Sequence, residues 1–528
     1  MTMAQEIEAR PQGDLFPSPL KTIFRSAGLF FAGMIFGKAA FYFFRLLVAR
    51  TGSSEYGTLS IALGIIDIIY AVSLLGLGVA LQKLISEKRS LGKNREVGDL
   101  LFTSFRAVFV VSLSFAVCLF VAADWIAVSL FHTAVLSDVL RILAIGVPFY
   151  AMQGVLFGTF RAFGKIQYEI LTKQFVETGL KLGFALAFIY AGWSLAGITI
   201  GYVLAIIIAF IVALLFLETK IRRFFTSGER YRGIEGEILP FSIPLMFSGL
   251  INFFLAWTDV FFLGYFWGAS EAGIYSTALP TAALLIMAPM SLNLLFLPIV
   301  SSLLTLNKTD EFRKIYSVLT KWAFGVNLAL FMLFAFFGRQ VLRVLFGQAY
   351  EDGELPLQIL SFGYLAYSLF FNSSDVLSAL GKTGQILTNI TLAAALNISL
   401  NYLLVPVYGI SGAAIATSLS LVLYGGLNAY GVFRLTGALP VSRAFIWMIV
   451  SGGASMFVSF AAFRALSIPS SDTSLLVFGM LYGLLYAVCL VLFRIPDRTD
   501  FEVLISIERK AGLNFAFIKR PLKKYYGL

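Results

Sequence analysis

Charged residues are scarce in this sequence. Only 13% of its 528 residues are Asp, Glu, Lys or Arg, whereas 59% are hydrophobic. This composition lies far outside the range of soluble globular domains. Apolar runs of about 20 residues recur between short polar or basic connections, as in membrane helices, whereas barrel strands would alternate over ~10 residues. The sequence therefore predicts an all-α, polytopic membrane protein.

Residues that support metal or nucleophile chemistry are also few. The chain has one histidine, His132, and two cysteines, Cys118 and Cys489, which lie in apolar runs. This leaves little material for a zinc site, a Cys/His nucleophile or a disulfide framework. We therefore expect no enzyme and no cofactor other than a coupling ion, Na⁺ or H⁺.

Fourteen segments are apolar and long enough to span a bilayer. The predicted spans are 24–49, 57–82, 99–123, 138–160, 167–190, 194–217, 238–264, 272–300, 316–337, 355–380, 384–406, 409–432, 443–465 and 474–494. Most of the 40 Lys and Arg fall on the side of the two termini, and only five fall on the other side. Because cytoplasmic loops are rich in Lys and Arg, both termini are expected in the cytoplasm. The same bias accounts for the net charge of +11 without nucleic acid as a partner.

An internal repeat divides the chain. Residues 31–63 align with 247–279 at an offset of 216, and AFGK at 162–165 aligns with ALGK at 379–382 at an offset of 217. Both copies contain six spans and run the same way, which predicts a parallel repeat with a site between two lobes near the midplane. The predicted parts are a cytoplasmic tail (1–23), a first lobe (24–217), a cytoplasmic linker (218–237), a second lobe (238–433), an additional helix pair (443–494) and a basic cytoplasmic tail (495–528).

The first lobe carries charge inside its spans. A charged side chain near the bilayer centre costs at least ~2.5 to 3.5 kcal/mol, so such residues usually face a partner or a water-filled cavity. Bases outnumber acids here, and an anionic substrate such as a pyrophosphate would balance the excess. Glu177, four residues from each of two lysines, is expected to hold them in place. Alternatively, the Lys-Glu-Lys cluster only joins helices. The predicted substrate residues are Lys38, Arg45, Arg106, Lys173, Glu177 and Lys181.

The second lobe lacks these bases and carries polar side chains. Asn397 and Asn401 lie one turn apart on one span, Asp259 lies on another, and Thr417 on a third. Carboxylate, amide and hydroxyl oxygens suit a hard monovalent cation, so these four residues are a predicted cation-coupling site. Hydrogen bonding between helices is the alternative reading.

Several stretches resemble a known transporter family. The sequence from Leu355 to Ala416, with SALGKTGQ at 378–385 and NISLNYLLVPVYGISGAAIATSLS at 397–420, resembles the multidrug/oligosaccharidyl-lipid/polysaccharide exporter superfamily. SEYGTLS at 54–60 looks like its polysaccharide-transporter, or oligosaccharide flippase, branch. This resemblance implies a monomeric flippase in the cell membrane that moves a polyprenyl-pyrophosphate-linked oligosaccharide by alternating access.

The resemblance also bears on individual parts. Lys38 matches a cationic position of the family's first helix, and Asp259, Asn397, Asn401 and Thr417 resemble its sodium site. The fourteen-helix layout is similar to that of the lipid II flippases, which implies that the last two helices hold the lipid tail. Asn401 stands where those proteins have a second carboxylate.

Two other functions remain open. A cation-coupled multidrug-type antiporter of the same superfamily would carry a cavity dominated by acidic residues. A membrane glycosyltransferase would need acidic metal-binding loops outside, where the sequence has only the cluster at 351–354. The basic-aromatic end of the chain, from Lys519 to Tyr526, is expected to lie on anionic membrane lipids.

Overall fold

The computed structural model describes residues 19–221, 234–306, 308–440, 444–465, 472–497 and 500. Within these ranges every regular element is a helix, so the predicted all-α class is confirmed. Nine helical runs in the described part are long and apolar enough to cross a membrane, as a multi-pass membrane protein requires. The number of fourteen spans stays a prediction. Most of the predicted N-terminal tail, linker and basic C-terminal tail (1–18, 222–233 and 501–528) lies outside the described residues.

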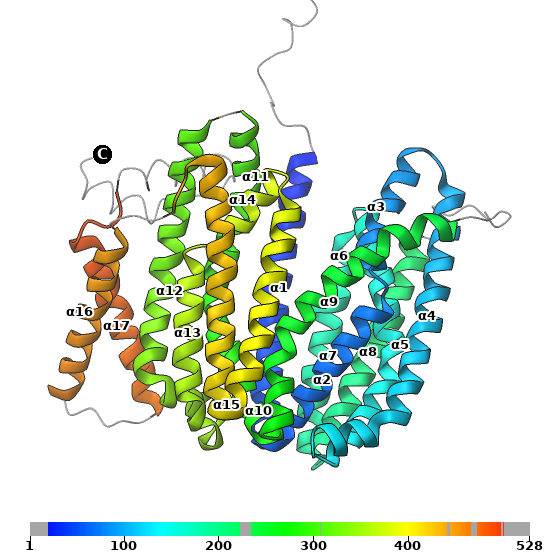
Figure 1. Cartoon of the computed structure of the whole chain (residues 1–528), viewed down its shortest axis with the longest axis horizontal. Helices are drawn as coiled ribbons and strands as arrows, with labels where there is room; N and C mark the ends of the chain where they lie inside the picture. Colours follow the sequence, from blue (N-terminus) through cyan, green and yellow to red (C-terminus); the bar gives the residue numbers. More distant parts are fainter. Residues whose placement is uncertain are drawn as a thin grey trace, which may run out of the picture.

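The first half of the chain packs as one group of helices, shown from blue to teal in Figure 1. Helices α3, α4 and α8 pack against α5, and α7 packs against α8 and α1. The elements are α1 (Pro19–Ala49), α2 (Ser53–Ser73), α3 (Leu77–Ser90), α4 (Asn94–Asp124), the π-helix η1 (Trp125–Leu130), α5 (Val135–Ala162), α6 (Ile166–Ile170), the π-helix η2 (Leu171–Glu177), α7 (Thr178–Tyr190) and α8 (Leu195–Lys220).

The second half forms another group, and a helix pair packs on its edge (Figure 1). Helix α15 contains two spans, because Gly409 breaks its helical geometry with φ 53° and ψ −132°. The elements are α9 (Ile234–Phe266), α10 (Ala269–Ala282), the 3₁₀ turn η4 (Ala283–Ile286), α11 (Met287–Thr305), α12 (Thr309–Phe346), the 3₁₀ turn η5 (Gln348–Gly353), α13 (Glu354–Ser368), α14 (Ser373–Ala379), α15 (Thr383–Thr436), α16 (Ala444–Ala465) and α17 (Asp472–Leu492).

Four predicted spans depart from a single regular α-helix. The span 57–82 breaks between α2 and α3, where Gly76 adopts φ 72° against the Ser242 carbonyl of α9. The span 167–190 contains the π-helix η2, 272–300 contains η4, and 355–380 breaks between α13 and α14. Hydrophobic runs report burial in lipid or protein, and they do not report a local change of hydrogen-bond register.

The predicted repeat pairs share backbone geometry. Gly164 and Gly381, aligned at an offset of 217, have φ of 66° and 71°. Gly192 and Gly409, aligned at the same offset, have φ of 78° and 53°. Such left-handed values are strained for other residue types. The two halves therefore turn at equivalent positions.

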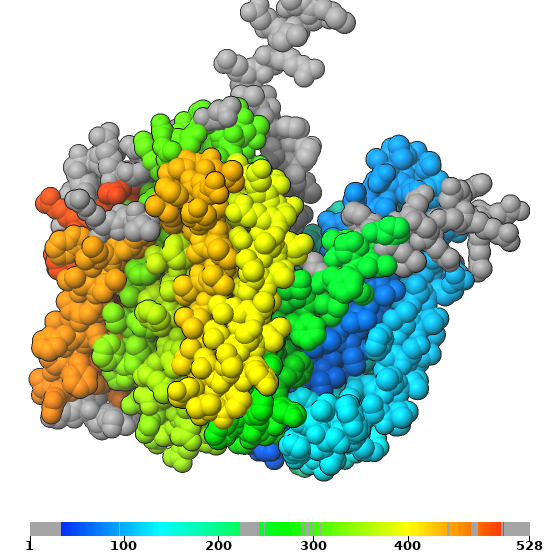
Figure 2. Space-filling model, in the orientation of Figure 1, coloured from blue at the N-terminus to red at the C-terminus, as the bar shows by residue number. Residues whose placement is uncertain are grey.

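The two groups of helices meet closely where α2 and α10 begin; we call this the α2–α10 contact. A Cβ on Gly57 would lie 1.6 Å from the Ala269 carbonyl oxygen, and a Cβ on Gly273 would lie 2.0 Å from the Ser53 carbonyl oxygen. The Oγ atoms of Ser53 and Ser270 are 2.8 Å apart. On the opposite side, where α3 and α14 end, Figure 2 shows the surface hollowed between the groups.

Helices α16 and α17 pack on α12 and are fixed there by a cluster that we call the C-terminal clasp: Lys321, Trp322, Asp497 and Asp500. The Lys321 ammonium, 4% exposed, lies 2.6 Å from Asp500 and 3.0 Å from Asp497. The Trp322 indole donates to Asp500 at 2.9 Å. Burial raises the pKa of Asp500, and Lys321 opposes that rise. The first residues after α17 are therefore part of the folded bundle.

Candidate functional site

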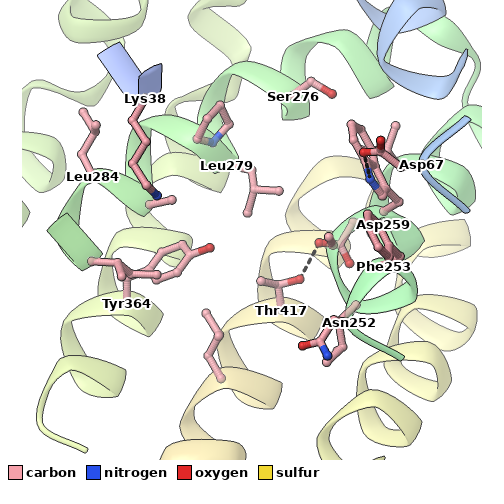
Figure 3. A pocket seen from close by; sticks show the side chains of 18 of the residues that line it. Lys38, Asp67, Asn252, Phe253, Asp259, Ser276, Leu279, Leu284, Tyr364 and Thr417 are labelled. Carbon is pink, nitrogen blue, oxygen red and sulfur yellow. Dashed lines mark hydrogen bonds between the residues drawn. The ribbon is translucent and has the colours of Figure 1, made fainter. Parts of the chain in front are cut away.

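A cavity of about 890 Å³ lies between the two groups of helices. Its walls come from α1, α2 and α8 on one side and from α9, α10, α11, α13 and α15 on the other, and most lining side chains are apolar or aromatic. Figure 3 shows Lys38 and Asp67 on opposite sides of this central cavity, with Asp259 and Thr417 close together on another wall. Pockets with apolar walls and a few polar groups are typical ligand sites.

Two predicted substrate residues, Lys38 and Arg45, line the central cavity from α1. They are seven residues apart, which places both on one face of the helix. The Lys38 side chain is exposed, and its ammonium lies 4.0 Å from the Met290 sulfur. The Arg45 guanidinium lies 5.1 Å from the Phe41 ring centre. Neither base forms an ion pair with a described residue, so both are available to an anion.

Arg106 and Lys173 are not among the lining residues of the central cavity. Arg106 is exposed on α4, and Lys173 is half-buried in η2. The structure thus brings together two of the six predicted substrate residues and places the other four elsewhere. Their role in substrate binding stays a prediction.

Lys181 and Glu177 form a buried pair behind the cavity wall. Their side chains are 6% and 4% exposed, and Lys181 Nζ lies 2.7 Å from a Glu177 oxygen. Lys181 Nζ also lies 3.8 Å from the centre of the Tyr202 ring, which lines the central cavity. Because the π-helix η2 ends at Glu177, the spacing of four from Lys173 does not bring Lys173 into this pair. The pair therefore contacts the cavity wall at Tyr202.

The four residues of the predicted cation-coupling site come together around Asp259, which is 2% exposed. The Asp259 carboxylate accepts from Asn401 Nδ2 at 2.7 Å, from Asn397 Nδ2 at 3.4 Å and from the Thr417 hydroxyl. Tyr275 on α10 donates at 2.5 Å and completes the cluster. The sequence analysis missed Tyr275, because a tyrosine in an apolar helix carries no distinguishing pattern.

A second carboxylate lines the central cavity, and its partner was also missed. Asp67 on α2 accepts from the Trp257 indole of α9 at 3.1 Å, and the Tyr150 hydroxyl lies 3.5 Å away. Asp67 is one of the two acids within the first-lobe spans, and the sequence analysis gave it no role. Nothing in the sequence around Trp257 indicated that its side chain contacts the other lobe.

Comparison with known families identifies the chain. A family model described as "Polysaccharide biosynthesis protein" matches residues 45–353, more than half of the sequence. The chain belongs to this family. Within this family match lie Arg45, Asp67 and Asp259, while Asn397, Asn401 and Thr417 lie beyond it.

Individual relatives cover part of the chain. The probable low-salt glycan biosynthesis flippase Agl15 of Haloferax volcanii is 25% identical over 261 residues, 49% of this chain and 55% of that protein. The probable flippase AglR of the same organism is 28% identical over 39% of this chain and 44% of its own length. The capsular polysaccharide biosynthesis protein CapF of Staphylococcus aureus is 26% identical over 35% of this chain and 46% of that protein. The chain therefore matches about half the length of these relatives.

Solved transporters share the fold. The lipid II flippase MurJ in an inward closed conformation superposes with a TM-score of 0.72, covering 88% of this chain and 98% of MurJ at 16% identity. An inward-facing MATE family multidrug transporter gives a TM-score of 0.65, covering 76% of this chain and 95% of that one at 17% identity. At these identities the likeness establishes the fold alone and says nothing about the substrate.

Proposed function

We propose that this protein is a flippase that moves a polyprenyl-pyrophosphate-linked oligosaccharide across the cytoplasmic membrane by alternating access. Family membership and the names of the partial relatives support a role in polysaccharide or glycan assembly. The transporter fold supports movement of a substrate through a cavity between two lobes. The same observations support a transporter in preference to an enzyme.

One observation carries the choice of substrate: Lys38 and Arg45 face the central cavity and pair with no described acid. Two acids also line this cavity, as a multidrug-type antiporter would require. Asp259, however, is enclosed by donors from four residues, which satisfy its charge within the protein. Among the described lining residues, two bases (Lys38 and Arg45) and one acid (Asp67) then remain without an ion-pair partner, so the excess charge in the cavity is basic, which favours an anionic headgroup such as pyrophosphate.

The orientation follows the distribution of basic residues. With both termini in the cytoplasm, the hollow seen in Figure 2 faces the cytoplasm, where lipid-linked precursors are assembled. The α2–α10 contact then closes the outer side. Helices α16 and α17 expose apolar side chains beside α12, and the lipid tail would run along them outside the cavity. We propose that the protein acts as a monomer.

Reconstitution tests this function. Purified protein in liposomes should move a fluorescent polyprenyl-diphosphate disaccharide between leaflets. Lys38→Gln or Arg45→Gln should slow this transport roughly ten- to hundredfold, because each variant loses a charge-assisted phosphate contact of ~1.5 to 3 kcal/mol. Lys93→Gln, an exposed first-lobe lysine outside the cavity, serves as the control. Unchanged transport in both cavity variants at normal expression would refute the pyrophosphate site.

We also propose that the Asp259 cluster binds a coupling cation, Na⁺ or H⁺. The residues fit a hard cation: besides the carboxylate and hydroxyl, the side-chain oxygens of Asn397 and Asn401 are buried and accept no hydrogen bond from any described residue. In the same liposomes, transport should respond to a sodium or proton gradient, and Asp259→Asn should abolish that response. Transport that ignores both gradients and this substitution would leave the cluster as interhelical hydrogen bonding.

A further inference from the structure

Asp67 joins the two lobes inside the central cavity. It belongs to α2 of the first lobe, and its Oδ2 accepts from Trp257 Nε1 of α9 at 3.1 Å. Tyr150 of α5 lies 3.5 Å from the other carboxylate oxygen. Among the described residues no base lies within ion-pair distance of this carboxylate. Its one close partner is therefore a neutral donor from the opposite lobe.

The Trp257 ring packs against α2 at a position without a side chain. Gly64, one turn before Asp67, has no side chain, and a Cβ there would lie 3.0 Å from the Trp257 ring and 2.8 Å from Phe261. The indole can therefore lie against the α2 backbone with its N–H at Asp67. Trp257 is also two residues from Asp259, so a change at Asp67 acts on the helix that carries the predicted cation site.

The charges around Asp67 come from several helices. Lys181 of α7, Lys173 of η2 and Arg45 of α1 act on it through space, and it acts in turn on Tyr70 of its own helix, Tyr150 of α5 and Tyr202 of α8. Glu177 already neutralises Lys181 at 2.7 Å. Lys181, Lys173 and Arg45 all favour the ionised carboxylate, and an anion bound beside Arg45 would offset part of that effect.

We propose that Asp67 is a proton-binding site of the first lobe, and that loading it releases Trp257 and favours separation of α2 from α9. The proton comes from water in the cavity and returns to water when the Asp67–Trp257 hydrogen bond forms again. A hydrogen bond to an ionised acceptor is stronger than one to a neutral acceptor, and the difference corresponds to roughly a fivefold change in the ratio of the two lobe arrangements. An anionic substrate beside Arg45 promotes this loading.

This inference rests on the proposed movement of two lobes, and its test needs no substrate. Spin labels at Leu91 and Leu306, exposed at the ends of α3 and α11, report the distance between lobes once both native cysteines are serine. From pH 8 to pH 5 the population with the distance of this structure should fall about fivefold relative to the alternative. Asp67→Asn should remove this response, Asp67→Glu should retain it, and the exposed Asp138→Asn should leave it unchanged.

A second variant keeps the test decisive if Asp67→Asn folds poorly. Trp257→Phe keeps an aromatic ring packed against α2 and the carboxylate intact but removes the N–H donor, so its distances should match the wild-type pH 5 distribution at both pH values. A wild type that does not respond to pH overturns the proposal. A response that persists in Asp67→Asn, or that is lost in Asp259→Asn instead, overturns it as well. Failure of the glycolipid assay alone would count against the proposed substrate and leave this result standing.

Discussion

The C-terminal clasp should depend on one buried charge. Lys321→Met keeps the length and apolar character of the stem while removing the ammonium that lies 2.6 Å from Asp500. The Asp500 side chain is 7% exposed, whereas Asp497 is 54% exposed and can turn to water. Only the Lys321–Asp500 pair should therefore contribute to the stability of the clasp. Breaking a buried ion pair costs about 3 kcal/mol at the low end of measured values. Opening of the clasp should become roughly 150-fold more frequent.

Amide hydrogen exchange measures this opening directly. The Asp497 N–H donates to the Asp500 carboxylate at 2.6 Å, and the Asp500 N–H donates to the Asp497 carboxylate at 3.0 Å. Both amides should be protected in the wild type and should lose about 150-fold protection in Lys321→Met. Lys308→Met, at the start of the same helix, breaks an exposed pair with Glu311 and should change protection by less than about threefold.

The clasp prediction includes a pH dependence. Burial raises the pKa of Asp500, and removing Lys321 removes the attraction that opposed the rise. The docked segment of Lys321→Met then tolerates the neutral carboxyl better than the carboxylate, so docking should recover as pH falls and weaken as pH rises through the docked pKa. Protection factors corrected for intrinsic exchange should therefore be higher at pH 5 than at pH 8 in this variant. Equal protection in wild type and Lys321→Met at pH 8 would refute the electrostatic account.

Two further predictions concern the first lobe. Gly57→Val inserts a side chain where α2 and α10 touch and should push the two helices apart. In a background without other cysteines, disulfide formation between Ser53→Cys and Ser270→Cys should then be at least about tenfold slower. An unchanged rate would contradict the close approach of the two helices. Glu177→Gln leaves the Lys181 ammonium buried without a counter-ion and should destabilise the folded protein by about 3 kcal/mol, measured as a lower melting temperature, while adding Lys181→Met should restore most of the loss.

The fold class followed from composition because membrane burial imposes a strong local requirement on each segment. An apolar run of about 20 residues satisfies its backbone in lipid almost only as a helix. Breaks within a run depend on distant contacts. Gly76 turns the chain from α2 into α3 where the backbone of α9 approaches, and no local pattern encodes that approach.

The site was predicted unevenly for a similar reason. Charge inside an apolar helix has few physical solutions, so Lys38 and Arg45 could be selected as cavity residues. Helical spacing also predicted the contact between Glu177 and Lys181. It could not tell which face of α4 points away from the cavity, so Arg106 was grouped with them although it is exposed outside the lining. Which side of a helix points to the cavity depends on the neighbouring helices, and the periodicity of the sequence does not identify those neighbours.

The internal repeat shows why the polar residues of the cavity matter more than the scaffold that carries them. At an offset of 216 the equivalent of Trp257 is Phe41 and the equivalent of Asp67 is Ala283, and both line the same cavity. The equivalent pair of helices therefore carries neither the indole donor nor the carboxylate acceptor. The other charged residues of the site also align with apolar residues at this offset. The aligned pairs are Lys38 with Phe254, Arg45 with Phe261, and Asp259 with Phe43. Two equal lobes would respond equally to a ligand, so a cycle driven by binding requires such differences. The residues that depart from the repeat are for this reason the ones to test first.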